Sequence, residues 1–126
     1  MNNLIKEYYL EKGFNCAETM LLTANDEFNM QLDESHIRIM SGFGGGMCRE
    51  KVCGVVTGGV AVLSIIFTDK DLLKKLVIEF QEKTEIEFSA NDCKAIKPSL
   101  RDELNKCANV IDKAYQILKN SILINK

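Results

Sequence analysis

The sequence predicts an all-α fold, a compact bundle of about five to six helices around a central apolar helix that contains glycines. Three observations favour this class. The 126 residues include a single proline, long stretches lack turn residues, and apolar residues recur at helical spacing. No repeat, linker or low-complexity segment divides the chain, so we expect one domain over residues 1–126.

Two helices are predicted at the N-terminal end of the chain. The first covers residues 3–12, and Gly13 is suited to end it in a left-handed conformation. Asn15 is a good N-cap for the second helix, because Glu18 follows three positions later, where its carboxylate reaches back to the cap amide. Cys16 is therefore expected in the first turn of a helix.

A glycine-rich segment separates a third predicted helix from the central one. The third helix is expected to start after Asp33 and to continue toward Phe43, and the glycines at 44–46 break it. The next helix begins at Lys51 or Val52 and continues to Phe67. It is apolar on nearly every face, which is typical of a helix surrounded by others.

The last third of the sequence predicts two more helices. Thr68 and Asp71 offer a cap for an amphipathic helix that continues through Phe80, after which the pattern lapses. Residues 85–97, closed by Pro98, are expected to form a loop or a short turn. The last helix is expected over residues 99–123, where apolar residues at steps of four and three share one stripe. These are Leu100, Leu104, Cys107, Ile111, Ala114 and Leu118, so Cys107 is expected to face the core.

Charge and hydropathy speak against two classes of partner. The formal net charge is -2, which provides no basic field for nucleic acid. The most apolar run, residues 52–67, is shorter than the roughly 20 residues that a membrane-spanning helix needs. The N-terminal residues show no basic segment followed by an apolar one, so we expect no secretory signal and a cytoplasmic protein.

Five cysteines are many for such a chain: Cys16, Cys48, Cys53, Cys93 and Cys107. A reducing cytosol discourages structural disulfides, so catalytic, redox-sensing and metal-binding thiols become the main interpretations, beside simple burial. Two of the five, Cys16 and Cys53, fall at predicted helix starts, where unpaired amides and the helix dipole favour the thiolate. Arg49 and Lys51 add positive charge before Cys53.

Several familiar motifs are absent. Four residues separate Cys48 from Cys53, so neither a CxxC redox motif nor paired zinc knuckles occur. Lys51 is not preceded by glycine or followed by Ser or Thr, which speaks against a phosphate-binding P-loop. His36, the single histidine, is expected in an exposed or hydrogen-bonded surface role rather than as a ligand.

Four stretches together resemble the family named for the C_GCAxxG_C_C cysteine pattern. They are NCAETML at residues 15–21, GFGGGM at 42–47, CGVVTGGVAVLS at 53–64, and the late pair Cys93 and Cys107. The resemblance covers nearly the whole chain. It implies that Cys16, Cys53, Cys93 and Cys107 act as a set and that Gly54 and Gly58 are the motif glycines. Val55 stands where the family usually has alanine, and Cys48 falls outside the set.

The resemblance implies redox activity and supplies no substrate. Our first hypothesis is thiol–disulfide chemistry by the four cysteines, as in a thiol-dependent oxidoreductase. The same four thiols are alternative ligands for zinc or an iron–sulfur cluster, with Gly54 and Gly58 letting a cofactor or a neighbouring backbone approach closely. A third hypothesis is a non-catalytic helical binding domain with buried cysteines.

The partners that these hypotheses require are not identified by any motif. A redox or transport partner fits the first two hypotheses. The terminal segment, residues 121–125, either mediates a homodimer or packs on its own core.

Overall fold

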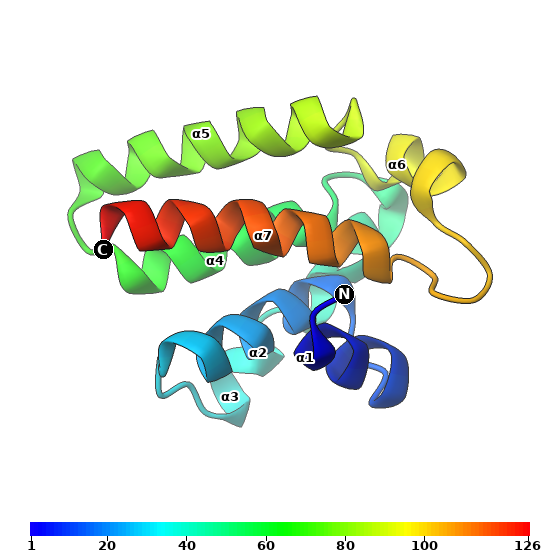
Figure 1. Cartoon of the computed structure of the whole chain (residues 1–126), viewed down its shortest axis with the longest axis horizontal. Coiled ribbons are helices and arrows are strands. Elements are labelled where there is room, and N and C mark those ends of the chain that lie inside the picture. Colours follow the sequence, from blue (N-terminus) through cyan, green and yellow to red (C-terminus); the bar gives the residue numbers. More distant parts are fainter.

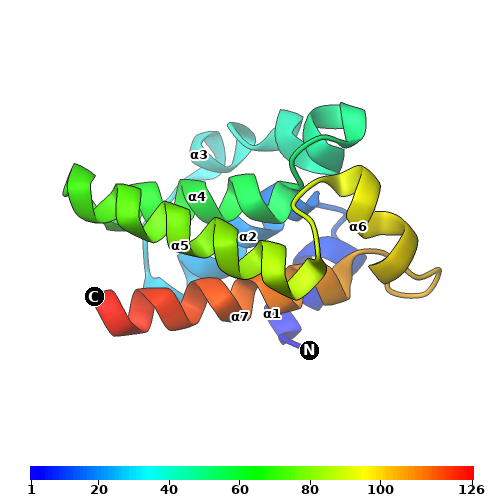
Figure 2. The same cartoon turned by 90° about the horizontal axis from the view of Figure 1, so that it is seen from above.

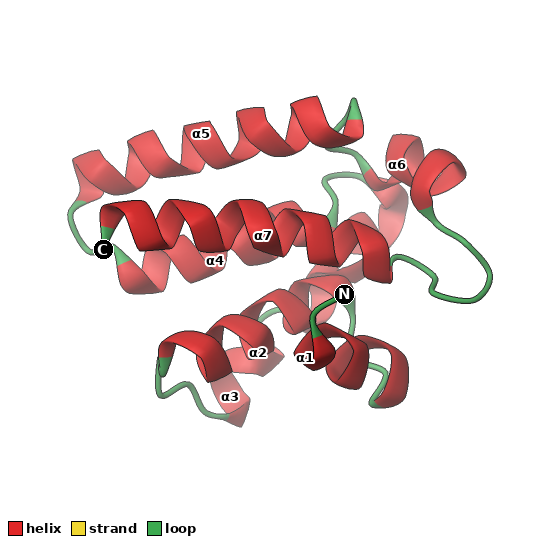
Figure 3. Cartoon of the chain, viewed as in Figure 1, coloured by secondary structure: helices red, strands yellow, loops and turns green.

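The computed structural model describes residues 1–126, and helices make up all of its regular structure (Figure 3). The all-α class is therefore confirmed, whereas the expected count of five to six helices is too low. Seven α-helices are present: α1 (Asn3–Ile5), α2 (Cys16–Phe28), α3 (Glu34–Arg38), α4 (Gly54–Ile66), α5 (Lys70–Phe88), α6 (Cys93–Leu100) and α7 (Ala108–Asn125). None of them is long and apolar enough to cross a membrane.

Helix α4 occupies the centre of the bundle. It contacts α2 on one side and α5 and α7 on the other, and the two views show it lying among these three helices (Figures 1 and 2). Its residues Val55, Val62 and Leu63 are completely buried. They belong to one hydrophobic cluster of 23 buried residues, so the core is continuous through the bundle.

The N-terminal helices follow local sequence signals closely. Helix α1 continues into a π-helical turn, Lys6–Glu11, and the chain turns at Gly13 with a φ of 77°. The predicted capping box at the start of α2 is present. The Asn15 side chain accepts a hydrogen bond from the Glu18 amide at 2.7 Å, and Glu18 accepts one from the Asn15 amide at 3.0 Å. These bonds place Cys16 as the first residue of α2.

The third helix is shorter than predicted. Helix α3 ends at Arg38, and a separate 3-10 turn, Ser41–Phe43, follows it. Helix α4 likewise begins at Gly54, after the predicted start, with Cys53 as its N-cap residue.

Helix α5 is longer than its apolar pattern suggests. Leu76, Phe80, Thr84 and Phe88 are all buried at steps of four residues. The Thr84 hydroxyl makes this possible, because it donates to the Phe80 carbonyl at 3.0 Å and so satisfies itself inside the helix. Because the third of these four buried residues is a threonine, the apolar pattern in the sequence did not predict the last two turns of α5.

The expected loop at residues 85–97 and the expected helix at 99–123 are also wrong in extent. Helix α6 occupies Cys93–Leu100 with Pro98 in its last turn, and α7 begins only at Ala108. Between them Arg101 is extended and Asp102 pairs with Lys106 in a tight turn. Leu104 lies in this turn, 84% exposed. The predicted apolar stripe faces the core only from Ile111 onward, where Ile111, Ala114 and Leu118 are buried.

Two glycines of α4 set its distance from α2. A Cβ atom on Gly58 would lie 2.8 Å from the Ala17 carbonyl oxygen and 2.9 Å from the Met20 Cβ atom. A Cβ atom on Gly54 would collide with the Cys16 sulfur and lie 3.0 Å from the Ala17 amide nitrogen. Side chains at these two positions would therefore push α2 away from α4.

We expect Gly58→Ala to lower the free energy of unfolding by about 1 to 2 kcal/mol. Overpacking costs about 1–3 kcal/mol, and the better helix preference of alanine returns at most about 1 kcal/mol. Urea denaturation measures the difference. Gly42→Ala is the matched control, because nothing lies within 4 Å of the added methyl group. A Gly58→Ala protein as stable as this control would contradict the close packing of α2 on α4.

Candidate functional site

Four of the five cysteines line a single cavity of about 110 Å³. They are the four expected to act as a set. The lining residues are Tyr9, Asn15, Cys16, Gly45, Cys53, Val55, Cys93, Lys97, Arg101, Cys107 and Val110. The structure thus brings together thiols that are up to 91 positions apart in the sequence.

Each of the four cysteines stands at the beginning of a helix. Cys16 and Cys93 are the first residues of α2 and α6, and Cys53 and Cys107 are the N-cap residues of α4 and α7. Four helix N-termini therefore meet at the cavity. Their unpaired amides and partial positive charges favour an anion there, whether a thiolate or a bound group.

Cys16 is the cysteine most readily ionised. A hydrogen bond from the Cys53 thiol lowers the pKa of Cys16 from the ordinary 9.0 to about 6, against the opposing effect of burial. The backbone amides of Gly45 and Ala17 also donate to its sulfur. These donors favour the thiolate form of Cys16, in agreement with its predicted place at a helix start.

Cys53 has the opposite character, and here the expectation from the sequence is wrong. The hydrogen bond to Cys16 is the main cause that raises the pKa of Cys53 far above its ordinary value, and burial is the second cause. The basic residues that precede it, Arg49 and Lys51, do not line the cavity. Cys53 thus remains a protonated thiol that donates to the neighbouring thiolate.

Cys93 and Cys107 complete the cavity wall. Cys93 is buried, and burial raises its pKa, while the positive charge of Lys97 opposes that effect. Cys107 is half-buried, and its sulfur accepts a hydrogen bond from the Arg101 guanidinium at 3.4 Å. The backbone amide of Cys107 donates to the Tyr9 hydroxyl at 3.2 Å. Cys107 is therefore part of the site rather than of the core stripe.

Sequence reasoning missed the two cations and the tyrosine of this cavity. Lys97 follows Cys93 by four positions, which places both on one face of a helix. That signal was hidden because residues 85–97 were expected to form a loop. Arg101 and Tyr9 carry no local signal, since both reach the cavity only through tertiary packing.

The glycine-rich segment forms one side of the site. Gly45 and Gly46 have φ values of 63° and 66°, and Met47, Cys48 and Glu50 also have left-handed backbones. A Cβ atom on Gly46 would collide with the backbone of Lys51, so only glycine fits there. This sharp path brings the Gly45 amide to the Cys16 sulfur.

Cys48 lies outside the cavity. Its side chain is exposed, and its sulfur is 3.9 Å from the Gly42 carbonyl oxygen. This position agrees with the sequence, in which Cys48 is not one of the four cysteines of the family pattern.

Gly54 and Gly58 serve the contact with α2. The Cys16 sulfur and the Ala17 backbone fill the space beside them. This close approach of a backbone is one of the two uses expected from the sequence. Their use in binding a cofactor stays a prediction.

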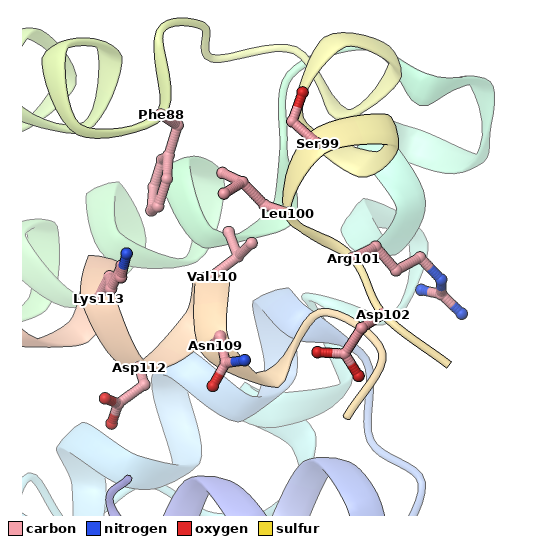
Figure 4. A pocket seen from close by; sticks show the side chains of 9 residues that line it. All are labelled: Phe88, Ser99, Leu100, Arg101, Asp102, Asn109, Val110, Asp112 and Lys113. Carbon is pink, nitrogen blue, oxygen red and sulfur yellow. The ribbon is translucent and has the colours of Figure 1, made fainter. Parts of the chain in front are cut away.

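A larger cavity of about 360 Å³ adjoins the cysteine cavity through Arg101 and Val110, which line both. It lies between the ends of α5 and α6 and the start of α7, and Figure 4 shows its lining side chains. No cysteine lines it. The Arg101 side chain points away from Phe88 and Leu100 in Figure 4. Its guanidinium instead contacts the cysteine cavity, where it donates to the Cys107 sulfur.

The side chains as placed do not converge on a metal ion. No group of three histidine, cysteine, aspartate or glutamate side chains is close enough to hold one. His36 lies on α3, where it caps its own helix by accepting from the Asp33 amide at 3.2 Å.

Comparison with known proteins identifies one family. The model of the family described as "Putative redox-active protein (C_GCAxxG_C_C)" matches residues 14–121. This range contains the four cavity cysteines and both motif glycines. No curated protein and no solved structure gives a significant match to the chain.

The pH dependence of alkylation tests the thiolate. We expect the rate at which iodoacetamide modifies Cys16 to rise with a midpoint at about pH 6, because the thiolate is the reacting form. In Cys53→Ala this midpoint moves up, since the thiolate loses its main hydrogen-bond donor. Mass spectrometry of the Cys16 peptide gives the rate. Cys48→Ala, outside the cavity, is the control, and an unshifted midpoint in Cys53→Ala would refute the assignment.

Proposed function

The chain belongs to the C_GCAxxG_C_C family, and from its cavity we propose that it carries out thiol–disulfide exchange. The observation that carries this proposal is that Cys16 and Cys53 line one cavity, where a hydrogen bond from the Cys53 thiol lowers the pKa of Cys16. A thiolate is the nucleophile of disulfide exchange, and a second thiol beside it resolves the intermediate. The protein is on this view a thiol-dependent oxidoreductase.

The proposed reaction has two steps. The Cys16 thiolate attacks one sulfur of a substrate disulfide, the S–S bond breaks, and the other substrate sulfur leaves as a thiolate. Cys53 then attacks the Cys16 sulfur of this mixed disulfide, and its proton passes to the second leaving sulfur. The two cysteines end as a disulfide, and the substrate ends as two reduced sulfurs.

Cys93 and Cys107 are proposed as the second pair of the set. They line the same cavity, and Arg101 donates a hydrogen bond to the Cys107 sulfur. Such a pair can reduce the Cys16–Cys53 disulfide by a further exchange, in which it becomes the disulfide itself. All four cysteines are catalytic in this scheme.

The setting of this chemistry is also part of the proposal. The cytoplasm suits it, because a reducing compartment returns the thiols to their starting state. A redox or transport partner would supply or remove the electrons. We take residues 1–126 as one domain, supported by the continuous core of 23 residues.

Metal binding by the same four cysteines is the second candidate. The convergence of four helix N-termini and two cations on four thiols favours it, since these charges would stabilise a set of thiolates. The lack of any three converging ligands speaks against it. A non-catalytic helical binding domain is the third candidate, in which the thiols only pack.

Peptide mapping tests the proposed exchange. We expect diamide, a small thiol oxidant, to join Cys16 to Cys53 with the loss of two hydrogens, and dithiothreitol to reverse this. Cys53→Ser should abolish the bridge because the resolving thiol is lost. Cys48→Ser is the matched control and should retain it, as Cys48 lies outside the cavity. Oxidation that yields no Cys16–Cys53 bridge would overturn the proposal.

Elemental analysis of protein prepared without oxygen tests the second candidate. We expect less than one equivalent of zinc or iron per chain and no visible absorption band. One or more equivalents, lost in Cys16→Ser and retained in Cys48→Ser, would instead establish the metal site.

A further inference from the structure

The size of the cysteine cavity limits what can reach the Cys16 sulfur. Its volume is about 110 Å³, smaller than the engineered cavity of about 150 Å³ that binds benzene. Cys53 and Cys93 are only 6% and 5% exposed, whereas Cys16 and Cys107 are half-buried. The part of a molecule that enters this space therefore has only a few non-hydrogen atoms, which favours a small substrate over glutathione disulfide or a peptide.

The charges around the cavity favour an anion. Lys97 and Arg101 line it, and no aspartate or glutamate does. The one carboxylate paired with these cations is that of Glu50, 3.7 Å from the Lys97 ammonium group, on a side chain that is 52% exposed. Four helix N-termini add partial positive charge. These groups can offset the repulsion between the Cys16 thiolate and an incoming anion.

From these limits we infer that the substrate is a small inorganic anion with a sulfur–sulfur bond, thiosulfate or a hydropolysulfide. The inference rests on the proposed function, because thiol exchange requires a substrate S–S bond. The cavity volume favours a small substrate over a bulky organic disulfide, and the cations favour a negatively charged one. Both anions offer the same chemistry, a sulfane sulfur that a thiolate can accept.

The Cys16 thiolate attacks the outer sulfur of thiosulfate, the S–S bond breaks, and its electron pair leaves with sulfite, so that Cys16 becomes a persulfide. Cys53 then attacks the inner sulfur of this persulfide, and its proton leaves with the outer sulfur as hydrosulfide. Two cysteine sulfurs are oxidised to a disulfide, and one sulfane sulfur is reduced to sulfide. A hydropolysulfide reacts in the same way, with a shorter polysulfide or hydrosulfide as the first leaving group.

Anaerobic kinetics with the reduced full-length protein test this inference. We expect thiosulfate or polysulfide to add one sulfur to Cys16 and then to form the Cys16–Cys53 disulfide with release of sulfide. Each anion is supplied separately, and the one that yields the persulfide and then the disulfide is the sulfur source. Sulfite is released only in the reaction with thiosulfate. Glutathione disulfide should react at least about tenfold more slowly than the preferred anion, since it is far larger than the cavity.

Charge variants test the role of the two cations. Lys97→Gln and Arg101→Gln should each slow the reaction with the anion roughly tenfold, as expected when local positive potential is removed. Added salt should slow the wild-type reaction and have less effect on these variants. Lys94→Gln is the matched control, an exposed lysine on the same helix, and should react as the wild type does. Circular dichroism checks that each variant is folded.

The outcomes separate this inference from the proposed function. If glutathione disulfide reacts with the wild type as fast as the anions do, or if the charge variants react like the Lys94→Gln control, the small-anion inference is overturned. The same holds if diamide yields the Cys16–Cys53 bridge while neither anion does, and the proposed function then stands. If diamide yields no such bridge either, both fall.

Discussion

The close contact between α2 and α4 is the constraint on which the site depends. Gly54 and Gly58 let the backbone of α2 lie directly against α4, with the Ala17 carbonyl oxygen where a side chain on Gly58 would stand. The first residue of α2 is Cys16, and the N-cap residue of α4 is Cys53. Helix packing therefore determines that these two sulfurs meet, and any side chain on Gly54 would separate them.

One hydrogen bond gives the two sulfurs opposite properties. The same interaction lowers the pKa of Cys16 and raises that of Cys53. It stabilises the thiolate form of Cys16, which accepts the hydrogen bond, and the protonated form of Cys53, which donates it. The amide of Gly45 adds to the effect on Cys16. Two identical side chains thus differ chemically because the helices and the glycine-rich loop surround them differently.

Local signals determine how much of this structure the sequence predicts. The cap at Asn15 and the apolar character of α4 are encoded within a few residues, and both were predicted. The extent of α5 was not predicted because Thr84, a polar residue, completes its buried stripe. Helix α6 was not predicted because Pro98 lies in its last turn and not at the start of the next helix. The four cysteines were grouped through the family pattern, whereas Tyr9 and Arg101 reach them only through contacts between distant segments.

The position of Cys16 and Cys53 at two different helix starts has a thermodynamic consequence. A bond between them would close a loop of roughly 40 residues, and such a crosslink restricts the unfolded chain enough to add about 4 kcal/mol to stability in the chain-entropy account. The two helices are already in contact in the reduced protein. Forming the bond would therefore require little rearrangement of the helices, and little of the added stability would be lost to strain. Electron transfer at this site would thus be linked to resistance against unfolding and proteolysis, with the oxidised molecule the more durable of the two.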